Sequence, residues 1–177
     1  MSQLNVATVN FTADSTQKKS FGHAYIVDQK AAATAGGSFT SGAWRTKDLN
    51  TEIFDYGGIV SISSNQFTLA NAGTYTIYWR SPALMVEYHI SRLYDVTNTT
   101  GYNGSSEYSY QDGATTHSVG NERITITGST VFEIQHYCNA TQSGDYGRGT
   151  SSGKGSSPGS GADVPNVYTI VEIWRES

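Results

Sequence analysis

The residues best suited to chemistry near neutral pH are four histidines, His23, His89, His117 and His136. No pair has the His-Glu-x-x-His spacing of a zinc site. His89 and His136 lie within runs of alternating polar and apolar residues, which favours hydrogen-bonded structural histidines over metal ligands. An ion-binding or pH-sensing position on a symmetry axis is the alternative for these two.

No pattern of nucleophiles, acids or glycines indicates an active site. No Gly-x-Ser-x-Gly elbow lies on a strand-to-helix turn. GRGTSSGKG differs from a phosphate-binding loop in its glycine spacing, and Gly155 stands where a serine or threonine would bind magnesium. There is no Asp-x-Asp/Asn calcium loop. Paired carboxylates for glycoside hydrolysis would have to come from scattered acids: Glu52, Asp55, Glu107, Asp112, Glu122 and Glu133. We therefore expect no enzyme, with no catalytic residue, metal or cofactor.

Tyrosines are dense between residues 88 and 110. Aromatic rings can stack on sugars or anchor an interface, although tyrosine is also common packing material in strands. Tyr102, Tyr108 and Tyr110 are the candidate ligand-binding residues, and a saccharide is the candidate ligand.

Composition excludes several classes of protein. The formal net charge is −4, and the basic residues are scattered, which argues against nucleic-acid binding. Cys138 is the only cysteine, so no disulfide can form within the chain, and its alternation with Phe132 and Ile134 predicts a buried, inert thiol. We identify neither a signal peptide nor an apolar run that could span a bilayer, and expect synthesis in a host cytoplasm.

Period-two alternation is the main structural signal. Tyr75, Ile77 and Trp79 fall on one face of a strand, and Phe132, Ile134, His136 and Cys138 behave likewise. The predicted strands begin near His23, then cover 59–63, 66–69, 74 to about Pro82, 86–96, 105–110, 115–118, 123–127, 131–139 and 166–175. Pro82 is expected to end its strand or lie at an edge. About ten strands with frequent turns predict an all-β, jelly-roll β-sandwich.

The predicted organisation is an arm, a domain and a loop. Residues 1–20 form an N-terminal arm or attachment peptide, and residues 21–177 form the domain. Within the domain, residues 143–163 are almost purely glycine and serine and predict a flexible or loosely folded loop between the last two strands.

Several ordered segments resemble a domain of tailed phages that infect marine and cyanobacterial hosts. They are GAWRTKDLNT, SNQFTL, GTY, HISRLYDVTNTT, GSSEYS, THSVGNERITI, VFEIQHYC and VYTIVEIW, and the resemblance extends from about Ala24 to Glu176. These phage domains are similar to the globular heads of tumour necrosis factor (TNF) and of the first complement component. The resemblance implies a TNF-like homotrimer displayed as a knob, fibre tip or head decoration. The Gly/Ser-rich loop is longer than the resemblance implies.

Large side chains on outward strand positions also favour a trimer, because a monomer rarely leaves such groups in a patch. Tyr78, Tyr137, Tyr168 and Trp174 are the candidate interface residues. The alternative is that these side chains form a second face of the sandwich core.

The function expected from this resemblance is a non-enzymatic structural protein on a virion surface, as a head decoration or head fibre that aids host attachment. Its partners would be further copies of itself and major capsid or tail proteins, which the arm would contact through Leu4, Val6, Val9 and Phe11. The alternative is a tail-fibre tip, an adhesin that recognises a host-surface polysaccharide. A polysaccharide depolymerase ranks third. Neither nucleic-acid binding nor membrane insertion is expected.

Overall fold

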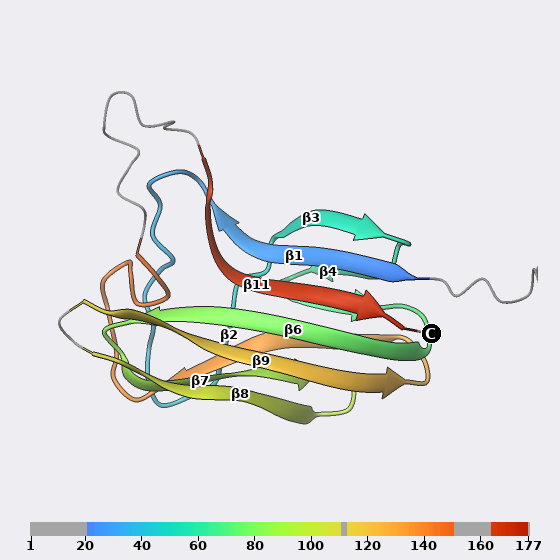
Figure 1. Ribbon diagram of the computed structural model, residues 1–177. Helices are drawn as coiled ribbons and strands as arrows, with labels where there is room; N and C mark the ends of the chain where they lie inside the picture. The colour runs from blue at the N-terminus through green and yellow to red at the C-terminus, as the bar shows by residue number, and fades with distance from the viewer. Residues whose placement is uncertain (1–20, 111–112, 151–163, 177) are drawn as a thin grey trace, which may run out of the picture.

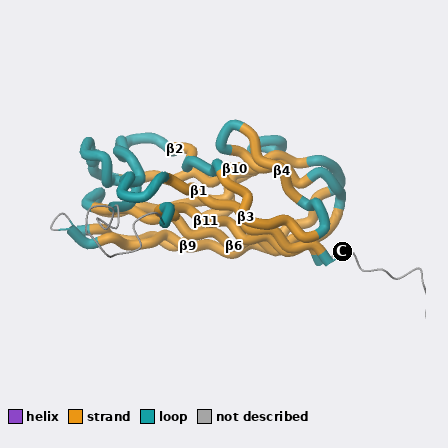
Figure 2. The backbone as a smooth tube through the Cα atoms, turned by 90° about the horizontal axis from the view of Figure 1, so that it is seen from above, coloured by secondary structure: helices purple, strands orange, loops and turns teal. Residues whose placement is uncertain are grey.

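The computed structural model describes residues 21–110, 113–150 and 164–176. These residues fold into eleven strands joined by loops, and the described part contains no helix (Figures 1 and 2). It accordingly has no helix long and apolar enough to cross a membrane.

The strands form two antiparallel sheets. The five-stranded sheet has the order β3-β1-β11-β6-β9. Its strands are β1 (Gly22–Lys30), β3 (Thr51–Tyr56), β6 (Gly73–Leu84), β9 (Thr115–Ile126) and β11 (Asn166–Arg175). The six-stranded sheet has the order β4-β5-β10-β7-β8, with β2 also paired to β10. Its strands are β2 (Arg45–Thr46), β4 (Val60–Ser63), β5 (Gln66–Leu69), β7 (Glu87–Asp95), β8 (Thr100–Ser109) and β10 (Thr130–Cys138).

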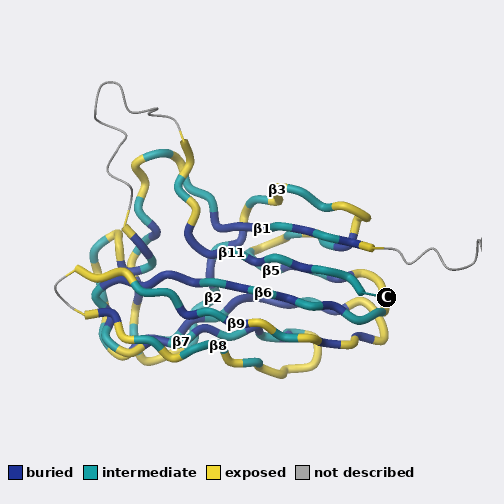
Figure 3. Tube along the Cα trace, in the orientation of Figure 1, coloured by how far each residue is buried: buried dark blue, intermediate teal, exposed yellow. Residues whose placement is uncertain are grey.

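Buried positions alternate with less buried ones along much of β6, β7 and β10 (Figure 3). The side chains at the buried positions fill the space between the sheets. The larger cluster, here called the apolar core, includes Tyr75, Ile77, Trp79, Phe132 and Ile134, all fully buried. The predicted faces of both strands are therefore confirmed.

A second, smaller cluster lies further along the same strands. It consists of Phe39, Ala83, Val86 and Cys138. Cys138 is buried as predicted, and burial raises the pKa of its thiol to about 11. Titratable side chains surround this cluster and are described below.

Several strands differ from the predictions. Residues 115–126 form one continuous strand, β9, because all twelve residues of β6 pair with it. Strand β8 begins at Thr100 rather than at residue 105. Strand β3 was not predicted, because its sequence, TEIFDY, does not alternate between apolar and polar residues and none of its side chains is buried.

Strand β6 continues beyond Pro82 to Leu84, so the prediction that Pro82 ends the strand is wrong. Its pairing with β11 extends only as far as Arg80. The Pro82 carbonyl accepts a hydrogen bond from Lys47, so the backbone nitrogen and oxygen of Pro82 point away from β9. A missing N–H there interrupts no ladder, as is usual for proline in sheets.

The predicted flexible loop is only partly described, and its described part, residues 143–150, is hydrogen-bonded. The amides of Gly36 and Gly37 donate to the carbonyls of Gly149 and Asp145, and the Leu84 amide donates to Gly147. Loose folding is therefore not observed for this part, because its backbone polar groups are paired with two other segments. Residues 151–163 and the arm, residues 1–20, lie outside the described residues.

Candidate functional site

The outer surface of the five-stranded sheet is unusually rich in aromatic rings. Cross-strand pairing sets His23 beside Tyr56 on β3 and beside Trp174 on β11. Tyr25 is paired in the same way with Phe54. We call this surface the aromatic face and define it as His23, Tyr25, Phe54, Tyr56, Tyr78 and Trp174.

Four ring contacts join five members of the aromatic face: His23, Tyr25, Phe54, Tyr56 and Trp174. The His23 imidazole is stacked on Trp174 with centroids 5.2 Å apart, and meets Phe54 edge-on at 4.9 Å. Its Nε2 lies 2.8 Å from a carboxylate oxygen of Glu172. Tyr56, at the sheet edge, is 67% exposed. The other five rings are half-buried, and contiguous apolar surface left partly exposed commonly marks an interaction site.

The four predicted interface residues do not form one surface. Tyr78 and Trp174 belong to the aromatic face. Tyr168 is 5% exposed, and its hydroxyl donates to the Thr34 carbonyl at 2.6 Å. Tyr137 lies on the outer side of the other sheet, with its ring 5.9 Å from that of Trp44. An outward position for Tyr168 was wrongly expected, because the segments around Thr34 and Gly149 cover the start of β11.

The outer side of the six-stranded sheet carries an ordered polar network. The Arg92 guanidinium lies over the rings of Trp44 (4.0 Å) and Tyr94 (4.7 Å). It donates two hydrogen bonds to Gln135 Oε1. Gln135 in turn donates to Glu133. This face is therefore polar and internally paired, unlike the aromatic face.

The three predicted ligand-binding tyrosines are also separated. Tyr108 and Tyr110 join Tyr88 in an exposed group, here called the tyrosine cluster, with ring centroids 4.8 and 6.2 Å apart. Tyr102 lies six residues before Tyr108 on β8, roughly 20 Å away at strand spacing. It lines a pocket near the opposite end of the sandwich.

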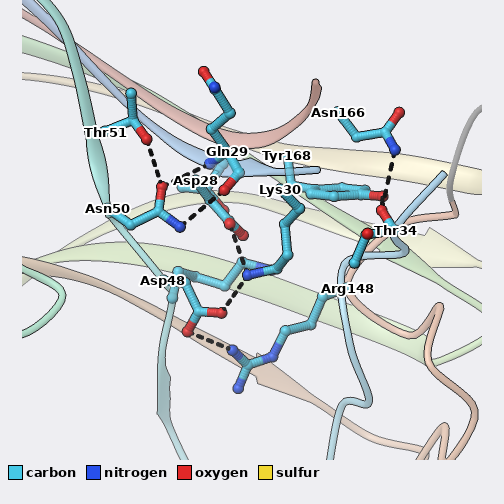
Figure 4. A network of polar contacts seen from close by, with 12 residues as sticks. Asp28, Gln29, Lys30, Thr34, Asp48, Asn50, Thr51, Arg148, Asn166 and Tyr168 are labelled. Carbon is cyan, nitrogen blue, oxygen red and sulfur yellow. Dashed lines mark hydrogen bonds and ion pairs between the residues drawn. The ribbon is translucent and has the colours of Figure 1, made fainter. Parts of the chain in front are cut away.

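A partly buried ionic network links β1, the segment after β2 and the start of the Gly/Ser-rich loop (Figure 4). Lys30 Nζ lies 3.0 Å from Asp28 and 2.8 Å from Asp48. Asp48 also contacts Arg148 at 3.4 Å. Asp28 is fully buried, and this burial raises the pKa of its carboxyl group.

Beside this network lies a fully buried lysine. Lys47 donates to the Pro82 carbonyl at 3.4 Å, and its Nζ lies 5.7 Å from the centre of the Phe39 ring. Burial, with the nearby positive charge of Arg148, lowers the pKa of Lys47 to about 7. Sequence reasoning missed Lys47, because its segment shows no alternation.

His89 and His136 form a buried chain of hydrogen bonds. His136 Nε2 lies 2.9 Å from His89 Nδ1, and His89 Nε2 lies 2.8 Å from the Thr116 hydroxyl. Burial, followed by the charge of Lys47, lowers the pKa of His89 to about 4 and that of His136 well below its usual value. The prediction of hydrogen-bonded structural histidines agrees with this geometry. Among the described residues, no group of three or more His, Cys, Asp or Glu side chains could hold a metal ion.

Comparison with known proteins gives a fold but no family. No protein-family model and no curated protein sequence matches the chain. Among solved structures, vertex protein P5 of PRD1 superposes with a TM-score of 0.55 at 12% identity, over 88% of this chain and 97% of that one.

Two further structures are similar. The globular domain of zebrafish complement 1qA gives a TM-score of 0.52 at 12% identity, over 90% of this chain and 98% of that one. Murine APRIL at pH 5.0 gives 0.51 at 5% identity, over 88% and 98%. At these identities the similarity shows the fold alone. The chain is a jelly roll of the TNF and C1q type, which confirms the predicted fold class.

Proposed function

We propose that the protein is a non-enzymatic structural component of a tailed-phage virion, a homotrimeric knob displayed on the particle surface. The fold similarity to a viral vertex protein supports a virion role. The sequence segments that resemble phage knob domains support the same assignment.

The aromatic face is the observation that carries the proposal. Its rings lie on adjacent strands of one sheet; Tyr56 is exposed in the single chain, and the other five are half-buried. Burying apolar surface contributes roughly 25 cal/mol per Å², so covering this face with further copies is favourable. Closed rotational symmetry covers it in every copy and leaves no open end.

The mass of the full chain in solution tests this proposal. Light scattering on a size-exclusion column should give three times the 19.1 kDa of one chain. Trp174→Glu and Tyr78→Glu place a charge in the aromatic face and should yield monomers. Trp44→Glu, on the opposite sheet, is the matched control and should remain trimeric. A monomeric wild-type protein, or a trimer that survives both aromatic-face changes, would contradict the proposal.

Virion attachment is proposed to use the N-terminal arm, through Leu4, Val6, Val9 and Phe11, on a major capsid or tail protein. These residues lie outside the described part of the chain. Full-length protein should co-sediment with purified particles of the phage that encodes it, whereas a chain lacking residues 1–20 should not. The truncated chain must keep the oligomeric state of the wild type in solution. If it still binds particles, attachment resides in the sandwich.

A second candidate function is an adhesin at a tail-fibre tip that binds a host-surface polysaccharide. The tyrosine cluster favours it, because Tyr88, Tyr108 and Tyr110 are 59%, 43% and 56% exposed and can stack on sugar rings. Binding to host cells should then be competed by soluble host polysaccharide. A Tyr88→Ser, Tyr108→Ser double variant should lose that binding while keeping the oligomeric state of the wild type. Binding that no host polysaccharide reduces would exclude this function.

A further inference from the structure

A pocket lies where the β7–β8 and β9–β10 turns meet at one end of the sandwich. It has a volume of about 360 Å³ and is lined by twelve residues, from 95–102 on one side and 124–130 on the other. This volume is at the lower end of the range for small-molecule sites. Both sheets contribute to it, since β7 and β8 belong to one and β9 to the other.

The pocket combines an apolar floor with a hydroxyl-rich rim. Ile124 and Ile126, each 7% exposed, belong to the apolar core, and the Tyr102 ring packs against the same core. Most of the remaining lining residues are threonine or serine. A ligand that fits such a lining presents C–H groups on one side and several hydroxyls on the other.

Asp95 supplies a fixed acceptor at this pocket. Its carboxylate is held by Asn98, whose backbone amide and side-chain amide each donate to one oxygen at 2.8 Å. Each carboxylate oxygen can accept more than one hydrogen bond, so both retain capacity for a ligand. Hydroxyl donors bind carboxylates more strongly than they bind neutral acceptors.

The lining selects for charge as well as shape. Asp95 is its only charged residue, and neither lysine nor arginine is present in it. Anionic ligands are therefore disfavoured. Exposed hydroxyls at Thr127 and Ser129 complete the rim, and within the described residues neither side chain forms a hydrogen bond.

From this combination we propose that the pocket binds one unit of a neutral saccharide. A sugar ring places its C–H face on Tyr102 and the isoleucines, and its hydroxyls donate to Asp95 and exchange hydrogen bonds with the rim. The pocket is distinct from the aromatic face and from the tyrosine cluster, so it goes beyond the structural role proposed above.

The test is an NMR titration of isotope-labelled full-length protein with a panel of neutral methyl glycosides: those of glucose, galactose, mannose and N-acetylglucosamine. At least one, at up to about 20 mM, should shift the amide signals of Thr127, Gly128 and Ser129 with saturation. Methyl glucuronide, the anionic counterpart of the glucoside, should give no saturable shift.

Variants identify the site. Thr127→Val with Ser129→Ala removes two exposed rim hydroxyls without disturbing a described hydrogen bond, and should weaken binding about tenfold, or roughly 1.4 kcal/mol. Asp95→Asn should abolish binding. If Asp95→Asn also disturbs the β7–β8 turn, the Thr127→Val, Ser129→Ala double variant and Tyr102→Phe still test whether the pocket binds the sugar. Tyr108→Ser, in the tyrosine cluster, is the control and should bind as the wild type does.

Three outcomes would overturn the proposal. The first is no saturable shift with any neutral glycoside. The second is a response confined to Tyr88 and Tyr108. The third is a shift of the pocket amides by calcium chloride, reversed by a chelator, with no response to sugars, which would assign the pocket to a cation.

Discussion

The two halves of the sandwich interior are built on the same strands but from different chemistry. Along β10, Phe132 and Ile134 enter the apolar core, whereas His136, two residues later on the same face, enters a region of buried titratable groups. We call that region, Asp28, Lys47, His89 and His136, the polar end. Hydrocarbon burial stabilises a fold at any pH, while buried titratable groups stabilise or destabilise it according to their protonation. One fold thus contains a pH-independent half and a pH-dependent half.

The largest expected effect tests the apolar half. Trp79 is fully buried, and its indole N–H donates to Ser91 Oγ at 3.0 Å. Trp79→Ala should lower the free energy of unfolding by about 3–5 kcal/mol, since it leaves a large cavity. Chemical unfolding at a fixed protein concentration measures this loss, which should be the same at pH 5 and pH 7, within about 0.5 kcal/mol. Trp44→Ala, on the outer surface, is the control and should lower the free energy of unfolding by less. Equal losses would contradict the contrast between core and surface.

The next largest effect tests the polar end in acid. Since the folded-state pKa of His89 is about 4, below its unfolded value, the unfolded chain binds protons first as the pH falls below about 6.5. The stabilising contribution is complete above that pH and is lost on acidification, by about 1.4 kcal/mol per pH unit and about 3 kcal/mol by pH 4. His136 contributes in the same direction.

Unfolding curves from pH 7 to pH 4 measure this slope. His89→Gln should make it shallower, whereas Trp79→Ala should leave it unchanged. Carboxylates also titrate in this range, so the difference between variant and wild type is the relevant quantity. An unchanged slope in His89→Gln would show that the buried imidazole does not couple to folding.

A smaller effect is expected in alkali. The pKa of Lys47 is about 7 when folded and near 10.4 in an unfolded chain. Between these values the unfolded chain binds the extra proton, so the free energy of unfolding should rise with pH, by about 2 kcal/mol between pH 7 and pH 9. Lys47→Met should abolish the rise. If wild type and variant respond alike, the amine keeps an ordinary pKa in the folded state, as it would if it reached water.

The smallest effect on stability is expected at a buried residue beside the polar end whose side chain behaves like a small hydrocarbon. Cys138→Ala removes one buried sulfur atom and should cost about 1 kcal/mol. The thiol pKa is about 11 when folded and near 8.5 in an unfolded chain, so neither state ionises below pH 7 and this cost should not vary between pH 5 and pH 7. A strongly pH-dependent cost would place Cys138 within the titrating network and blur the boundary between the two halves.

The apolar half was predictable from the sequence, and the polar half only in part. Alternation alone gave the inward faces of β6 and β10, because side chains in a strand point to opposite sides in turn. Asp28 carried a usable signal, since it continues the inward series of Ala24 and Ile26 along β1. Lys47 had none. Its burial depends on Arg148 and Pro82, which lie far away in the chain and come together only through loop packing.

The candidate surfaces divide in the same way. Outward positions for Tyr78 and Trp174 followed from strand period, but the aromatic face also needs β3 and β1, whose pairing order no local pattern reveals. Tyr168 was wrongly expected to face outward, because loops distant in the sequence cover it only in the folded chain. The pocket at Asp95 joins two turns about 30 residues apart, so only Tyr102 within it was singled out beforehand.

The three tryptophans of the chain occupy three different layers. Trp79 lies in the apolar core, Trp174 on the aromatic face, and Trp44 beneath the Arg92 guanidinium on the far side of the sandwich. Intrinsic fluorescence can therefore be separated by location. In variants that retain one tryptophan, emission from position 79 would follow unfolding, emission from position 174 would follow dissociation of the proposed trimer, and quenching at position 44 would report the stacked cation. The molecule thus carries its own optical probes for folding, assembly and surface order.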